Sequence, residues 1–176
     1  MHILDISENS IRAKASLISI GIKVDKAEDT LAIVISDNGV GMSSELLERV
    51  RSPFATTRET RDVGLGIPLF AASCERTGRA LKIESTQGIG TKLTAEYCLS
   101  NIDRPPIGEL SETMHALVMM NPHIDFVLTT GGSEEFVFDT RQIKKQLGEV
   151  PITNNDVLLF IKEYLSEGIT EILGGI

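Results

Sequence analysis

The sequence has no apolar stretch long enough to cross a membrane. Its longest apolar runs, Leu31 to Ile35 and Val157 to Ile161, fall far short of the ~20 residues that a spanning helix needs. The chain also opens without a basic segment followed by an apolar one, so we expect no secretory signal. It has only two cysteines, Cys74 and Cys98, without CxxC spacing. We therefore expect reduced, buried thiols and a cytoplasmic location.

Basic residues are also in the minority. Seventeen Lys and Arg stand against 25 Asp and Glu, which gives a formal charge of -8. A surface this negative repels nucleic acid and anionic lipid, so we expect neither a nucleic-acid partner nor a membrane partner. The charge does not exclude ATP, because a phosphate pocket is built locally from backbone amides, arginines and a metal ion.

The apolar residues that are present predict both helices and strands. The first helix is expected to carry Leu4, Ile11, Ala15 and Ile18 on one stripe. The run 31–35 is apolar throughout and is expected to be a strand buried on both faces. Further strands are predicted over 19–25, 81–86, 91–97, 124–129 and 135–138, and further helices over 43–50, 64–77, 109–120, 140–147 and 156–165.

Two groups of polar residues and glycines lie early in the chain. Asp5, Asn9 and Arg12 are spaced i, i+4, i+7 and share one helical stripe, although such a stripe alone is more often a solvated face. The segment 37–41, Asp-Asn-Gly-Val-Gly, follows a predicted strand. Its acid can accept a hydrogen bond from an exocyclic amine, and its glycines let a planar ring approach the backbone. A plain Asx turn explains the same residues equally well.

Two further groups follow. Gly64-Leu65-Gly66 opens a predicted helix, where phosphate oxygens can approach free N–H groups. The preceding loop supplies hydroxyls and a cation suited to phosphate, from Thr56, Thr57 and Arg58. The segment 88–91, Gly-Ile-Gly-Thr, lies where a strand restarts and by itself indicates only a hairpin turn.

The order and spacing of the four groups resemble the four ATP-binding boxes of one family. That family, known as GHKL, unites histidine-kinase catalytic domains, DNA gyrase, the heat-shock chaperone ATPase and the mismatch-repair protein MutL. The segment 5–15 is similar to its N box, and the segments 37–41, 64–66 and 88–91 are similar to its three glycine boxes. The segment 52–58, Ser-Pro-Phe-Ala-Thr-Thr-Arg, resembles the lid of nitrogen-sensing histidine kinases.

The resemblance implies an α+β fold of Bergerat type. This is a two-layer α/β sandwich with a mixed, largely antiparallel sheet and helices on one face. Residues 1–98 would form the ATP-binding domain, with its N-terminal elements missing or truncated. Residues 99–107 would be a linker, and 108–176 a small α/β extension of unknown role.

The resemblance also implies a role for each site residue. Asn9 would hold magnesium through its side-chain oxygen, and Asp37, supported by Thr91, would bind the adenine amino group. Asp5 stands where gyrase and MutL carry a glutamate that activates water, so it is the expected general base. The other expected nucleotide contacts are Gly39 and Gly41 at the adenine, and Gly64, Leu65, Gly66, Thr56, Thr57, Arg58 and Arg12 at the phosphates.

From these roles we expect a magnesium-ATP-binding, histidine-kinase-like ATPase domain that phosphorylates or regulates a partner protein. No histidine of the chain lies in the context of a phosphoacceptor. An ATP-gated conformational protein of the MutL kind and a non-catalytic nucleotide-binding regulatory module are the alternatives. A homodimer that completes the sheet is also possible.

Overall fold

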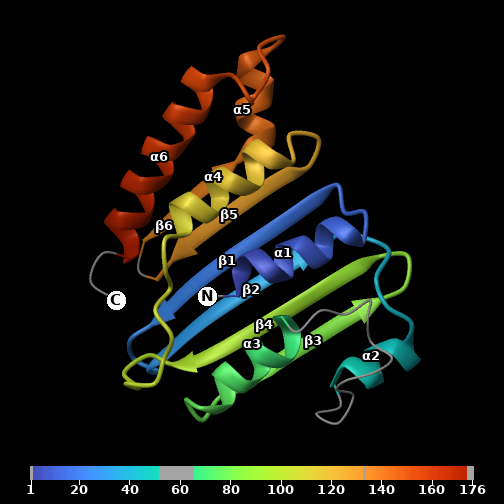
Figure 1. Cartoon of the computed structure of the whole chain (residues 1–176). Coiled ribbons are helices and arrows are strands. Elements are labelled where there is room, and N and C mark those ends of the chain that lie inside the picture. Colours follow the sequence, from blue (N-terminus) through green and yellow to red (C-terminus); the bar gives the residue numbers. More distant parts are fainter. Residues whose placement is uncertain (1, 52–65, 133, 174–176) are drawn as a thin grey trace.

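The computed structural model describes residues 2–51, 66–132 and 134–173. They form one sheet with helices on one face (Figure 1). No helix among these residues is long and apolar enough to cross a membrane. The elements are α1 (Ile3–Arg12), β1 (Leu17–Asp25), β2 (Thr30–Asp37), α2 (Ser44–Arg51), α3 (Gly66–Glu75), β3 (Leu81–Thr86), β4 (Gly90–Cys98), α4 (Leu110–Met120), β5 (Asp125–Gly131), β6 (Glu135–Asp139), α5 (Thr140–Leu147) and α6 (Asn155–Leu173).

The sheet has six strands in the order β3-β4-β2-β1-β5-β6. Every neighbouring pair is antiparallel except β1 and β5, which run parallel. The expected α+β class, with a mixed and largely antiparallel sheet, is therefore confirmed. The strands β5 and β6 come from the C-terminal part of the chain, and they continue the same sheet beyond β1.

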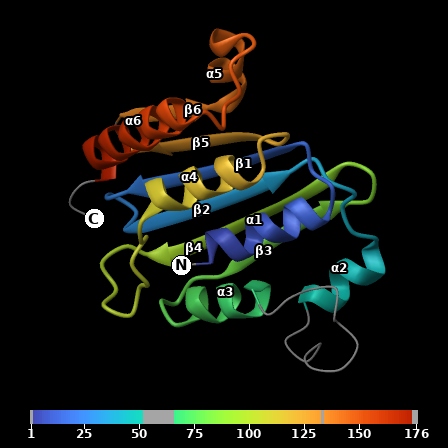
Figure 2. The same cartoon turned by 45° about the horizontal axis from the view of Figure 1, so that its top comes forward.

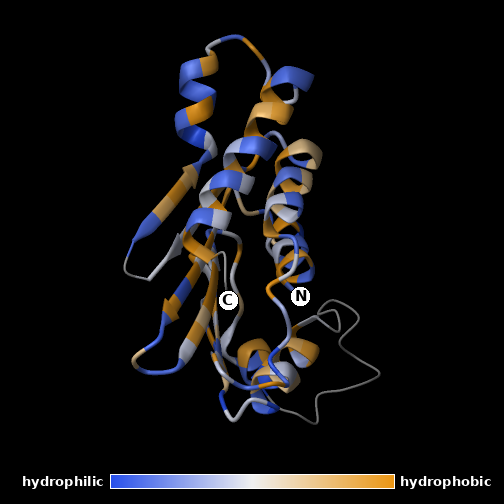
Figure 3. Cartoon of the chain, turned by 90° about the vertical axis from the view of Figure 1, so that its left-hand side faces the viewer, coloured by the Kyte–Doolittle hydropathy of each residue, from blue (hydrophilic) through white to orange (hydrophobic). Residues whose placement is uncertain are grey.

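One face of the sheet is apolar because alternate residues of each strand point to it. In β2, Leu31, Ile33 and Ile35 are buried beneath the helices, whereas Ala32 and Val34 are half-buried on the opposite face. Figures 2 and 3 show that α1, α3, α4 and α6 lie on the same side of the sheet. The prediction that β2 is buried on both faces was wrong, because no described helix covers its second face.

The first helix is shorter than its apolar spacing predicts. It ends at Arg12, its buried residues include Ile3 and Ile6, and Leu4 is 40% exposed. Lys14 adopts a φ of 60°, and the N–H of the residue after it donates to the carbonyl of Ser10. This left-handed closure terminates the helix, so Ala15 and Ile18 leave the predicted stripe. Ile18 lies in β1 instead.

The last helix is longer than predicted. It continues to Leu173 rather than ending near Leu165, with Gly168 buried inside it. A Cβ at Gly168 would lie 2.2 Å from a ring carbon of Phe136. The glycine is therefore a packing residue that lets α6 approach β6 closely, and it does not stop the helix.

Candidate functional site

The centre of the candidate site is the carboxylate of Asp37, at the end of β2. One oxygen, Oδ1, accepts the N–H of Gly39 at 2.8 Å, and the other, Oδ2, accepts the hydroxyl of Ser10 at 2.7 Å. Asp37 is half-buried on the helix side of the sheet. Each oxygen has a further lone pair, so the oriented carboxylate can accept another hydrogen bond from an amine.

The loop after Asp37 is fastened to the end of α1. The side-chain oxygen of Asn38 accepts the N–H groups of Ser16 and Leu17, both at 2.9 Å. The N–H of Val40 donates to the carbonyl of Ala13 at 2.9 Å. These bonds hold the loop against the entry to β1 and fix the position of the carboxylate that precedes it.

Two glycines of this region allow backbone contacts that a side chain would block. Gly41 has a φ of 63°, and a Cβ there would lie 2.1 Å from the carbonyl oxygen of Thr86. Gly90 has a φ of 141°, and its Cβ would lie 2.0 Å from the carbonyl oxygen of Asp37. The first and third glycine boxes therefore meet at the end of β2, as the resemblance implies.

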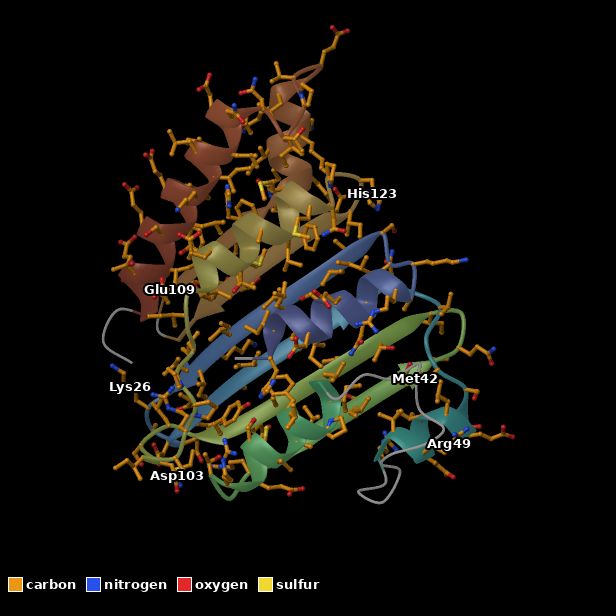
Figure 4. The ribbon with its side chains drawn as sticks, viewed as in Figure 1. Lys26, Met42, Arg49, Asp103, Glu109 and His123 are labelled. Carbon is orange, nitrogen blue, oxygen red and sulfur yellow. The ribbon has the colours of Figure 1, made fainter. Side chains whose placement is uncertain are left out.

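Thr91 lies directly beside Asp37 in the register of β2 and β4. Its hydroxyl is 2.9 Å from that of Ser85 on β3. Ser85 also accepts the N–H of Met42 at 2.8 Å and donates to the carbonyl of Gly90 at 3.0 Å; Met42 is labelled in Figure 4. A chain of hydroxyls thus links the Asp37 loop to the hairpin of β3 and β4.

The other end of the site lies between α1 and α3. Asp5 and Asn9 are one turn apart on α1, and the start of α3 is close to both. A Cβ at Gly66 would lie 3.1 Å from Cβ of Asp5 and 4.0 Å from Nδ2 of Asn9. The side chain of Asp5 is 56% exposed, with Oδ2 3.5 Å from Nδ1 of His2. The N box and the last residue of the second glycine box are therefore adjacent.

The remaining predicted contacts are less well placed or lie elsewhere in the chain. Arg12 is exposed, and its guanidinium is 3.6 Å from Glu8; its role at the phosphates stays a prediction. The residues Thr56, Thr57, Arg58, Gly64 and Leu65 lie outside the described residues.

Two hydroxyls were missed by sequence reasoning. Ser10 orients Asp37, and Ser85 connects Met42, Gly90 and Thr91. The spacing of Ser10, one residue after Asn9 inside the N box, was the only signal that could have suggested its position. Nothing in the sequence marks Ser85.

The arrangement joins two kinds of chemistry. At one end, a carboxylate and a hydroxyl can recognise the hydrogen-bonding edge of a base. At the other, an amide, a carboxylate and a helix start suit phosphates and a cation. Among the described residues, no three His, Cys, Asp or Glu side chains are grouped to hold a metal alone.

A comparison with protein families matches residues 2–101 to the family described as histidine kinase-, DNA gyrase B-, and HSP90-like ATPase. The sensor protein DegM of Bacillus sp. (strain B21-2) is 30% identical over 91 residues, which are 52% of this chain and 24% of that protein. Sporulation kinase C of Bacillus subtilis (strain 168) is 32% identical over 88 residues, 50% of this chain and 20% of that protein. The matched region thus spans a quarter or less of each relative.

Among solved structures, the Aquifex aeolicus MutL ATPase domain complexed with ADP aligns with a TM-score of 0.49 and 14% identity. The alignment covers 92% of this chain and 85% of that one. The family match includes every described site residue from Asp5 to Thr91. Because it extends over more than half of the 176 residues, the chain belongs to the family of histidine kinase-, DNA gyrase B- and HSP90-like ATPases.

Proposed function

We propose that this chain binds magnesium-ATP and uses it to phosphorylate or regulate a partner protein in the cytoplasm. The observation that carries the proposal is the orientation of Asp37, whose two oxygens are fixed by Gly39 and Ser10 with Thr91 alongside. This is the hydrogen-bonding arrangement that the exocyclic amine of adenine needs. The two free cysteines, Cys74 and Cys98, support the cytoplasmic location.

The described residues at one end of the site would bind adenine, and those at the other end would bind the phosphates and magnesium. Asp37 accepts the adenine amine, and the backbone of Gly39 and Gly41 would line the ring. The start of α3 at Gly66 directs N–H groups toward the phosphates. Asn9 would hold magnesium through its side-chain oxygen, and the ion would offset phosphate charge when bound.

Asp5 is the proposed general base. It lies one turn before Asn9 on α1, and its exposed carboxylate can accept a proton from a water or hydroxyl that attacks the terminal phosphate. The names of the relatives include a sensor protein and a sporulation kinase, and they support transfer to a protein over simple hydrolysis.

The test uses ATP labelled at its terminal phosphate, with wild type, Asp5→Asn and Glu8→Gln. Glu8 is a matched control, because it is an exposed carboxylate on the same helix that faces Arg12. Label that is released or transferred by wild type and Glu8→Gln, but not by Asp5→Asn, supports the proposed role of Asp5. If wild type and both variants bind ATP but neither release nor transfer the labelled phosphate, the chain is a non-catalytic regulatory module instead.

A further inference from the structure

The negative charge of the protein is concentrated in its C-terminal part. Residues 99–176 contain twelve Asp and Glu against five Lys and Arg, a formal charge of -7. Residues 1–98 contain thirteen against twelve, a formal charge of -1. The part of the chain without an assigned nucleotide contact therefore carries nearly all of the net charge of -8.

Within this part, β6 forms one edge of the sheet. It pairs with β5 on one side only, and no strand among the described residues pairs with its other side. Figure 1 shows β6 at the edge of the sheet beside α6. An edge strand presents unpaired N–H and C=O groups that can accept another strand.

An aromatic strip flanks this edge on the helix side. The rings of Phe160 and Tyr164 stack at 5.9 Å with an angle of 11°, and Tyr164 is 5.2 Å from Phe136 of β6. Phe160 remains 57% exposed and Tyr164 40% exposed. On the other face of the strand, Val137 is 46% exposed. An added strand would therefore meet apolar surface with its side chains on both faces.

Acidic residues surround one end of this strip. Glu167 and Glu171 lie seven and eleven residues after Phe160 in α6, so they share the helical stripe of Phe160 and Tyr164. The contacts of Phe138 with Tyr164 and of Phe136 with Gly168 show that α6 runs antiparallel to β6. The two glutamates therefore lie toward the start of the strand.

That end of the strand is itself acidic. Glu134 and Glu135 are exposed there, and they line a groove of about 440 Å³ on the open face of the sheet. Two nearby cations are paired, Lys162 with Glu112 at 2.8 Å and Arg141 with Asp139 at 2.7 Å, whereas Lys23 lines the same groove as Glu134 and Glu135. The edge thus combines apolar contact surface with more carboxylates than cations.

We propose that the free edge of β6, together with the Phe160–Tyr164 strip, binds a segment of a partner protein that alternates apolar and basic side chains. The segment adds to the sheet as a strand through backbone hydrogen bonds. Because successive side chains of a strand point to opposite faces, its lysines or arginines face α6 and meet the aromatic rings and the glutamates of the strip. Its apolar side chains face the other side of the sheet and contact Val137. This proposal goes beyond the nucleotide site and does not depend on it.

Charge decides between this partner and a second copy of the chain. An antiparallel pairing of two β6 strands centred on Val137 would place Glu135 of one copy opposite Asp139 of the other. The C-terminal parts of the two copies, residues 99–176, would each carry a formal charge of -7. Like charges that face each other across strands are destabilising, so the edge suits a basic segment better than its own copy.

The first test measures binding of two labelled peptides to the full chain by fluorescence anisotropy. One has the sequence Lys-Val-Lys-Phe-Lys-Val-Lys, and the other has glutamate in place of each lysine. We expect binding of the basic peptide only, weakening as salt is added, with slower hydrogen exchange at the amides of β6. No binding of either peptide at millimolar concentration, or equal binding of both, would overturn the proposal.

A second measurement places the peptide on the molecule. The double variant Glu167→Lys and Glu171→Lys should lose about tenfold in affinity for the basic peptide, whereas Glu149→Lys, exposed in the loop before α6, should lose much less. Equal losses would overturn the assignment of the site. Sedimentation that shows a dimer which Phe160→Ala dissociates would also overturn it, because a second copy would then occupy the edge.

Discussion

Replacement of Asp37 by asparagine changes the proposed adenine contact with little change of shape. The asparagine oxygen can still accept the N–H of Gly39. Its amide group would face Ser10, whose hydroxyl can turn toward the carbonyl of Ile6, 3.4 Å away. We therefore expect Asp37→Asn to fold normally, but to present a donor where the carboxylate presented an acceptor.

The size of the effect follows from the lost bond. A hydrogen bond to a charged partner contributes about 1.5–3 kcal/mol, and about 1.4 kcal/mol corresponds to a factor of ten in affinity. Asp37→Asn should therefore raise the Kd for magnesium-ATP by about ten- to a hundredfold.

The assay is calorimetric titration with ATP and with inosine triphosphate, which has a carbonyl where adenine has its amino group. Wild type should prefer ATP, and Asp37→Asn should lose or reverse that preference. The control is Asp25→Asn at the far end of β1, where the carboxylate accepts two backbone N–H groups at 3.0 Å. An unchanged preference in Asp37→Asn would refute the assignment of the adenine contact.

Three further predictions concern stability, measured by urea unfolding. Gly41→Ala should lower the free energy of unfolding more than Gly88→Ala does. Both residues have a positive φ, but only the alanine methyl at position 41 would meet backbone atoms. Equal losses of about 1 kcal/mol for the two variants would contradict this. Gly168→Ala should lower the free energy of unfolding by about 1–3 kcal/mol, despite the higher helix propensity of alanine, and an unchanged or higher value would contradict the tight packing of α6. A hydrogen bond from the Cys98 thiol is the main cause that lowers the pKa of Asp29, so its contribution is present above the unfolded-state pKa of about 4 and lost as the pH falls through the lower folded-state value. Asp29→Asn should therefore be less stable than wild type at neutral pH and equal to it in strong acid, and a difference that does not vary with pH would contradict this.

The sheet was largely predictable because its strands carry local signals. The hairpin of β3 and β4 has alternating residues around a glycine turn, and β1 alternates in the same way. The apolar run of β2 was misjudged because five consecutive apolar residues look alike whether one face is covered or two. Only the position of the helices, which is a tertiary property, distinguishes the cases.

The ends of the helices depended on contacts distant in the sequence. The end of α1 is fixed by the left-handed Lys14 and by a loop anchored through Asn38, neither of which the apolar spacing reveals. Gly168 resembles a helix stop, but it is retained inside α6 by its contact with Phe136. These features could not be predicted because their partners lie far away along the chain.

The candidate site was predictable where glycines and acids follow a fixed order, as at Asp37 and Gly41. It was not predictable where common hydroxyls complete it. Ser10 lies 27 residues from Asp37, and Ser85 lies 43 residues from Met42. Serine has too many ordinary roles for its position alone to indicate that it supports a site.

We propose that α1, the Asp37 loop, α3 and the hairpin of β3 and β4 together hold one molecule of magnesium-ATP. Calorimetric titration of the purified chain with ATP, in the presence of magnesium and after its removal, measures this binding. We expect saturable binding at a single site, which weakens without magnesium and in Asn9→Ala. Absence of any binding heat from the wild-type chain at millimolar ATP with magnesium would contradict it.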